Sequence, residues 1–179
     1  MKLLRTIRLD PSDTFVFEKA AEPGEWAVSG AFAFAHLDVA ALAGKGRAAF
    51  RSGFLGIDSL GWSTLVQIVE ASEEDRVRAV EILAQRLVER FGAPDLATAR
   101  PSAEEEVAFA ASLSVHPKGM LAAVARKFED GAIREAFRTL TPSIGPKPLR
   151  AYAFLEVAGE DEPPEEHVDL VTIAKGKPT

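Results

Sequence analysis

The chain has 179 residues, of which 27 are acidic and 21 basic, so its formal net charge at pH 7 is −6. An acidic protein binds nucleic acid poorly, because contacts to phosphates supply most of the non-specific affinity. Without cysteine the chain forms no disulfide, thiolate metal site or catalytic thiol, and no apolar stretch reaches the roughly 20 residues that a membrane span needs. We therefore expect a cytoplasmic protein with neither nucleic-acid nor membrane partners.

The length and the 47% hydrophobic content predict one buried core. We expect residues 1–179 to form a single α+β domain, mainly an antiparallel sheet with two or three helices packed on it. Segments rich in aromatic and β-branched residues, bounded by turn signals, predict the strands of this sheet. These segments are residues 2–9, 14–18, 26–35, 47–55 and 63–71.

Glycines punctuate the apolar segment 50–66, where they occur at positions 53, 56 and 61. Glycine weakens a strand by roughly 0.5–1 kcal/mol relative to alanine, so its repetition marks places where a side chain would obstruct a turn, a bulge or a partner. We interpret the segment as two strands that meet at a tight corner.

Two helices follow in the sequence. Ser72 and Asp75 have the spacing of a capping box, and an apolar stripe then continues to Phe91, where Gly92 and Pro94 end the helix. A second capping box, residues 102–105, predicts a helix that reaches Ser114, with Pro117 after it.

Residues 120–140 are ambiguous. Their apolar residues fit helical spacing, but residues 129–131, Glu-Asp-Gly, could equally turn a hairpin. Our interpretation favours a strand followed by a helix. Further on, residues 149–157 and 168–174 predict two more strands, joined by an acidic loop near residues 159–166.

The cations Lys45 and Arg47, with Arg51 near them, are interleaved with glycines in a pattern that would suit an anion. A solvated turn explains the same residues, and their spacing does not match a Walker loop. Ser59 does not have the Gly-x-Ser-x-Gly spacing of a hydrolase nucleophile.

Two histidines lie two residues before an aspartate, His36 before Asp38 and His167 before Asp169. Such pairs arise by chance in a chain so rich in acidic residues, and neither resembles a His-Glu-x-x-His helix. We predict no metal site and no catalytic residue. The basic residues at 126, 127, 134 and 138 are interpreted as a solvated surface, with a patch that docks an acidic partner as the alternative.

The runs FRSGFLG at residues 50–56, GWSTL at 61–65 and EDGAIREAFRTL at 129–140 resemble a family of small uncharacterised bacterial proteins with no assigned activity. The resemblance covers nearly the whole chain and transfers no catalytic residue. It implies at most an accessory role, linked to the maturation of a metalloenzyme such as formate dehydrogenase.

No chemical signature is complete in this sequence, so our leading hypothesis is a non-catalytic accessory or assembly protein that binds a protein partner at the 50–66 corner through Phe54 and Trp62. An exposed strand edge would also allow a homodimer. The alternative hypothesis is an enzyme or small-molecule binder of unidentified cofactor, with an aromatic pocket closed by Arg51 or His36. The residues predicted to line that pocket are Trp26, Phe50, Phe54 and Trp62.

Overall fold

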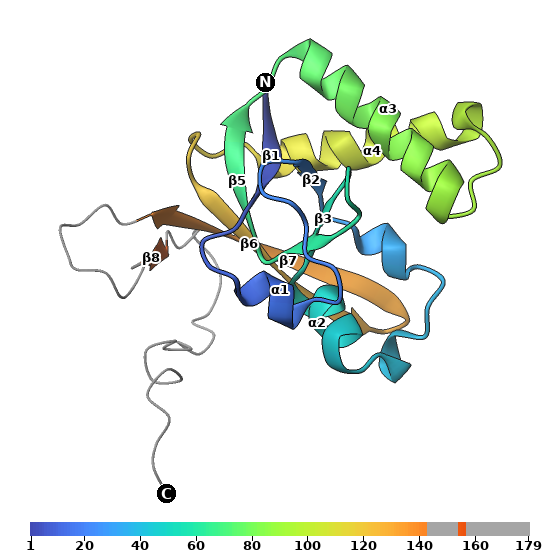
Figure 1. Ribbon diagram of the computed structural model, residues 1–179, viewed down its shortest axis with the longest axis horizontal. Helices are drawn as coiled ribbons and strands as arrows, with labels where there is room; N and C mark the ends of the chain where they lie inside the picture. Colours follow the sequence, from blue (N-terminus) through green and yellow to red (C-terminus); the bar gives the residue numbers. More distant parts are fainter. Residues whose placement is uncertain (143–153, 157–179) are drawn as a thin grey trace, which may run out of the picture.

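The computed structural model describes residues 1–142 and 154–156, and they form an α+β structure built on an antiparallel sheet (Figure 1). The sheet order is β4-β3-β2-β1-β5-β6-β7-β8. In chain order the elements are β1 (Lys2–Ile7), α1 (Ser12–Val16), β2 (Trp26–Val28), the 3-10 helices η1 (Ala31–Phe34) and η2 (Val39–Ala41), α2 (Gly44–Ser52), β3 (Phe54–Gly56), β4 (Trp62–Ser63), β5 (Leu65–Glu70), α3 (Glu73–Arg90), α4 (Leu96–Leu113), β6 (Leu121–Glu129), β7 (Ala132–Pro142) and β8 (Phe154–Glu156).

The helices form two groups (Figure 1). Helices α3 and α4 pack against each other, and α4 also contacts β1 and β2, whereas α2 contacts β6 and α1. The main core lies between the sheet and the α3–α4 pair, where Leu4, Ile68 and Leu83 are fully buried. A second apolar cluster fills the space around α1 and α2 and consists of Phe17, Phe34, Ala49 and Phe50. The expected α+β class with an antiparallel sheet is confirmed.

Helix α3 matches its predicted start and end. The Ser72 hydroxyl accepts a hydrogen bond from the Asp75 amide at 3.0 Å, and the Asp75 carboxylate accepts one from the Ser72 amide at 2.9 Å. Gly92 follows the helix with a φ of 79°, as a left-handed stop requires. Because these signals are local, the sequence was sufficient to place this helix.

Helix α4 begins six residues before the predicted start at residue 102. Asp95 caps it instead, since its carboxylate accepts a hydrogen bond from the Thr98 amide at 2.8 Å. Pro101 therefore lies inside the helix, where it removes one backbone hydrogen bond. Ala99 and Ala103 on either side of it are buried in the main core, and this packing offsets the loss.

Three predicted strands are wrong in whole or in part. Residues 14–18 contribute to α1, residues 47–55 are mostly α2, and residues 26–35 supply only β2 before the chain turns into η1. Aromatic residues favour strands on local propensity, but here Phe17, which follows α1, and Phe50 on α2 are both buried in the second cluster. The tertiary contact overrides the local preference. The predicted strands 2–9 and 63–71 are confirmed as β1 and β5.

Residues 121–142 form a hairpin, so the helix expected in the second half of the 120–140 segment is wrong. Asp130 and Gly131 make the two-residue turn with φ values of 53° and 75°, both positive as a type I′ turn requires. Ile133, Glu135 and Phe137 alternate along β7 and lie opposite β6 residues. Their spacing had also suited a helix, and the turn residues decide between the two.

The last predictions fall mostly outside the described residues. Strand β8 lies within the predicted strand 149–157 and pairs with β7. The acidic loop near 159–166 and the predicted strand 168–174 lie beyond what the structure describes. No helix in the described part of the chain is long and apolar enough to cross a membrane.

The predicted corner is confirmed in part: β3 and β4 pair antiparallel, but residues 50–52 at the start of the segment belong to α2. At Gly61 the backbone runs directly against residues 19–21, where the Trp62 amide donates to the Lys19 carbonyl at 2.9 Å and the Ala21 amide donates to the Trp62 carbonyl at 2.8 Å. A Cβ atom on Gly61 would overlap the Ala20 carbonyl group. The glycine at this position is required by the close approach of two backbones.

We expect Gly61→Ala to lower the free energy of unfolding by about 1–3 kcal/mol, because the methyl group forces these backbones apart. Gly46→Ala is the control. Gly46 lies inside α2, and a Cβ atom there would meet only the Leu42 side chain, at 3.7 Å. The higher helix propensity of alanine should therefore raise the free energy of unfolding by about 0.5–1 kcal/mol. Urea unfolding of both variants measures the difference. Equal stabilities would contradict the proposed steric role of Gly61.

Candidate functional site

The strongest polar cluster in the described residues is built around Arg126 on β6. This residue is only 2% exposed, although an arginine is almost never buried without partners. It points to the same side of β6 as the buried Ala122 and Val124, because alternate residues of a strand share a face. The hairpin therefore carries a charged group into the interior of the protein.

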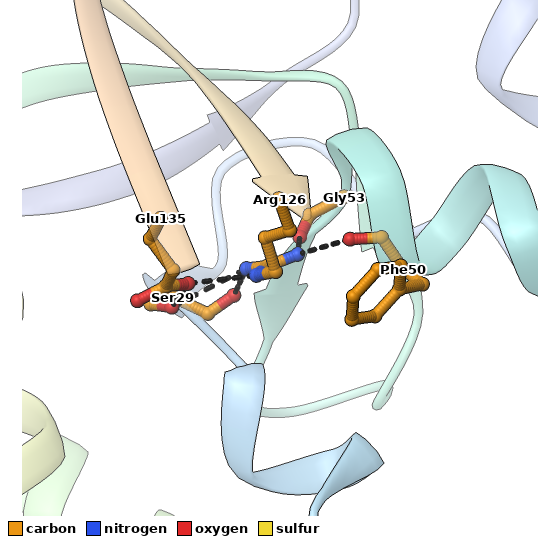
Figure 2. Close-up of polar contacts among 5 residues, drawn as sticks. All are labelled: Ser29, Phe50, Gly53, Arg126 and Glu135. Carbon is orange, nitrogen blue, oxygen red and sulfur yellow. Dashed lines mark hydrogen bonds and ion pairs between the residues drawn. The ribbon is translucent and has the colours of Figure 1, made fainter. Parts of the chain in front are cut away.

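Figure 2 shows how the guanidinium is satisfied. Its Nε donates to Glu135 Oε1 at 2.7 Å. Its Nη1 donates to the carbonyls of Gly53 at 2.7 Å and Phe50 at 3.1 Å. Its Nη2 donates to the Ser29 carbonyl, and to the Ser29 hydroxyl at 3.3 Å. A guanidinium has five N–H groups, and these five contacts use all of them.

The partners of Arg126 come from segments far apart in the sequence. Phe50 and Gly53 lie at the carboxyl end of α2, where unpaired carbonyls and the helix dipole favour a cation. Ser29 directly follows β2, and Glu135 is the direct β7 partner of Arg126 in the hairpin register. One side chain thus joins α2, β2 and both strands of the hairpin.

Glu135 completes the charge balance of the cluster. Its side chain is 15% exposed, and its Oε1 atom also accepts a hydrogen bond from the Ser29 hydroxyl. Burial lowers the pKa of Arg126, while the hydrogen bond to Glu135 acts in the opposite direction. The guanidinium stays protonated, as arginine does in proteins. The pair is therefore a buried ion pair with further hydrogen bonds.

A second carboxyl group, that of Glu106 on α4, lies near this pair. Burial and the negative charge of Glu135 raise the pKa of Glu106 to about 7, although the positive charge of Arg126 acts against the rise. Arg126 has no N–H left with which to bind Glu106. A carboxyl group with a near-neutral pKa is a candidate for proton chemistry.

Metal binding is not supported by the described residues, since no group of three or more histidines and carboxylates is placed to hold a metal ion there. A cavity of about 10 Å³ lies in the main core, close to the least volume that holds one water. Its lining is apolar and comes from β1, β2, α3 and α4, with Ile57. This cavity is too small for a metabolite.

The aromatic residues predicted to line a pocket are divided between the two cores. Trp26 and Phe54 are buried in the main core, and Phe50 is buried in the second cluster. Trp62 is half-buried, contacts both clusters and stacks on Phe34 with ring centroids 5.1 Å apart. The guanidinium carbon of Arg5 lies over the ring of Trp26, 4.0 Å from the ring centroid. The four rings contribute to packing in these positions.

The predicted polar site residues all lie at the surface. His36 is exposed after η1, and Arg51 is exposed near the end of α2. Lys45 and Arg47 were expected in a loop but belong to the first turns of α2, where Arg47 Nε donates to the Leu42 carbonyl at 2.8 Å. Arg51 and His36, which were expected to close the aromatic pocket, are exposed, whereas Trp26 and Phe54 are buried.

The interpretation of the basic run as solvated surface or docking patch is wrong for Arg126, because that residue is buried. A signal for its burial exists in the sequence: in a hairpin that turns at Asp130 and Gly131, Arg126 faces Glu135 and shares its side with Val124. The helix interpretation of residues 131–140 hid this pairing. Ser29 and Glu106, which complete the cluster, carried no such signal.

Comparisons with known proteins assign the chain to a family but do not give it an activity. Residues 1–152 match the model of a family described as a family of unknown function (DUF6505). No curated protein and no solved structure matches the chain. Its function must therefore be inferred from the geometry of its own residues.

We expect Arg126→Met to lower the free energy of unfolding by about 3–5 kcal/mol, because Glu135 would keep a buried charge and the three carbonyls would lose their donors. Replacing Glu135 by Met as well should recover part of this loss, since no unpaired charge then remains. Arg134→Ala on the exposed side of β7 is the control and should change stability by less than about 0.5 kcal/mol. Unfolding in guanidinium chloride measures the stability of all three variants. A small loss of stability in Arg126→Met would refute the structural role assigned to Arg126.

Proposed function

This chain belongs to the DUF6505 family of unknown function, and from its surface we propose that it is a non-catalytic accessory protein that binds another protein through helices α1 and α2. The single observation that carries the proposal is the exposure of Phe15. Phe15 is 72% exposed, which is the largest exposed fraction among the large apolar residues in the described part of the chain. A phenylalanine in this position gains most from a partner that covers it.

Helix α1 is held so that its apolar tip faces outward. Phe17, just after the helix, is fully buried, and the Asp13 carboxylate accepts hydrogen bonds from the Thr64 amide at 3.1 Å and the Thr64 hydroxyl at 2.5 Å. Between these two anchors, Phe15 and Val16 are exposed. The anchors fix the backbone, so a partner would meet a preorganised apolar surface.

Helix α2 lies beside α1 (Figure 1) and supplies charge. Its exposed side carries Lys45, Arg47 and Arg51, and the helix contains no acidic residue. Arg47 and Arg51 share one face because they are four residues apart. Apolar side chains beside cations suit a partner surface in which carboxylates surround an apolar patch.

The corner at residues 50–66 is a weaker candidate for the docking surface, because Phe54 is fully buried. Truncating Phe54 would open the core and would not report on binding. The link to maturation of a metalloenzyme such as formate dehydrogenase stays a prediction. Identification of the partner protein would test it.

We expect a photo-crosslinking amino acid at position 15 to capture one specific protein in host cells. The same probe at Val115, which is 71% exposed and lies after α4, is the matched control and should not capture that protein. Exchanging Arg47 and Arg51 for glutamate should abolish capture from position 15, because an acidic partner would then be repelled. Mass spectrometry identifies the product and circular dichroism checks that each variant is folded.

Three outcomes would refute the proposal. Equal capture from positions 15 and 115 would mean non-specific contact, and capture that survives the charge reversal would exclude an acidic partner surface. Crosslinking to a second copy of the chain alone would show a self-association surface in place of an accessory function.

A further inference from the structure

The outer edge of β7 is open along most of its length in the described part of the chain. Strand β6 pairs with one edge of β7 over residues 132–140, and on the other edge β8 pairs with residues 140–142. We propose that residues 132–139 bind an extended segment of a partner protein as an added strand, one that alternates apolar and acidic side chains. This inference does not depend on the docking surface proposed for α1 and α2.

The geometry of the hairpin decides which backbone groups of β7 point outward. Its two-residue turn makes the flanking residues, Glu129 and Ala132, a hydrogen-bonded pair, and such pairs alternate with non-hydrogen-bonded ones along the ladder. Ile133, Glu135 and Phe137 therefore direct their N–H and C=O groups away from β6. No backbone hydrogen bond from another described residue reaches these groups. They form a row with which a strand can pair.

The open stretch of β7 lacks two common protections of an edge strand. Natural proteins keep such strands short or interrupt them with a bulge or a proline. Strand β7 has 11 residues, its pairing with β6 is continuous from Ala132 to Leu140, and its one proline, Pro142, lies at the end beside β8. The row of outward groups is therefore regular, and the charges of β7 decide which strand it accepts.

These charges disfavour pairing with a second copy of the chain. In a two-fold antiparallel pair, the registers that overlap over most of the open edge are centred on Arg134, Glu135 or Ala136. Registers nearer the turn leave little overlap, and registers further along meet β8. The first two registers place Arg134 or Glu135 against its own copy, and the third places Arg134 against Arg138. Each brings like charges directly opposite one another, which is destabilising.

The same charges favour an acidic strand. On the outer face of β7, Arg134 is exposed, and Arg138 follows it on the same face. Within β7 this face carries no acidic residue, and Lys127 of β6 lies directly opposite Arg134. The neighbours of Arg134 on this face are alanines, which leave space for longer side chains. Carboxylates on an added strand would therefore lie beside cations.

The other face of an added strand would meet apolar side chains. Phe137 is half-buried and meets Phe109 of α4 edge to face, with ring centroids 5.7 Å apart, yet Phe109 is still 39% exposed. Ile133 lies nearer the turn on the same face and is also half-buried. Glu135 between them is already paired with Arg126. Apolar side chains at alternate positions of an added strand would cover Phe137 and Ile133.

The test uses the full-length protein and, as the probe, an acetylated and amidated peptide of alternating valine and glutamate. We expect the amide hydrogens of Ile133, Glu135 and Phe137 to exchange quickly in the free protein, and at least about tenfold more slowly with excess peptide. The amides of Arg134 and Ala136 face β6 and should change less. A peptide with lysine in place of glutamate should cause no slowing. Exchange followed by NMR resolves each amide.

A charge reversal on the edge tests the acidic preference. Arg134→Glu should weaken binding of the glutamate peptide at least about tenfold, because carboxylates would then oppose carboxylates. Arg78→Glu makes the same change of net charge at an exposed position of α3 and is the matched control. It should bind the peptide as the wild type does. Circular dichroism checks that both variants are folded.

The exchange measurement on the wild type decides the question even if Arg134→Glu does not fold. No slowing with the glutamate peptide, or equal slowing with the lysine peptide, overturns the proposal, as does unchanged affinity in folded Arg134→Glu. Slow exchange of the three outward amides in the dilute free protein would mean that the chain itself covers this edge. Slowing that follows protein concentration without peptide would assign the edge to a second copy, against the proposal.

Discussion

The guanidinium of Arg126 loses its contacts with water when the protein folds, and the elements around it must replace those contacts. Removing an ion from water costs several kcal/mol even after relaxation, so the cation is tolerated only with a complete set of partners. Four of its five partner atoms belong to residues at least 73 positions away in the sequence. The end of β2, the end of α2 and the β6–β7 hairpin must therefore assemble together.

This buried contact also connects the interior to the surface that we propose for docking. Arg126 holds the carboxyl end of α2 through the carbonyls of Phe50 and Gly53, while the ring of Phe50 is buried with Phe17 and Phe34 in the second cluster. Helix α2 is thus fixed from inside by one cation and presents other cations on its outer side. On the α4 side, the same saturated guanidinium has no N–H group left to donate to Glu106. One interaction therefore shapes the electrostatics of two separate surfaces.

The sequence predicted the elements whose signals are complete within a few residues, such as the Ser72 capping box of α3 and the alternating strands β1 and β5. It did not predict α1 and α2, because their conformation depends on the second cluster, in which Phe17 and Phe50 are buried although they lie far apart in the sequence. The burial of Arg126 was not predicted either: its carbonyl partners leave no pattern of residue types, and its pairing with Glu135 was hidden by the helix expected for residues 131–140. The capping box at Ser102 placed the start of α4 too late, because Asp95 caps the helix and Ala99, in the turn before Ser102, is buried in the main core.

The two-residue turn at Asp130 and Gly131 has a consequence for how this chain can change in evolution. It aligns Arg126 with Glu135 and Lys127 with Arg134. One residue inserted in the turn would shift this register and bring Arg134 opposite the buried guanidinium, exchanging inside and outside along β7. The exposed tip of the hairpin should therefore tolerate substitutions freely but not changes in length, so sequences that diverge from this one should keep the spacing of nine positions between the arginine and its carboxylate.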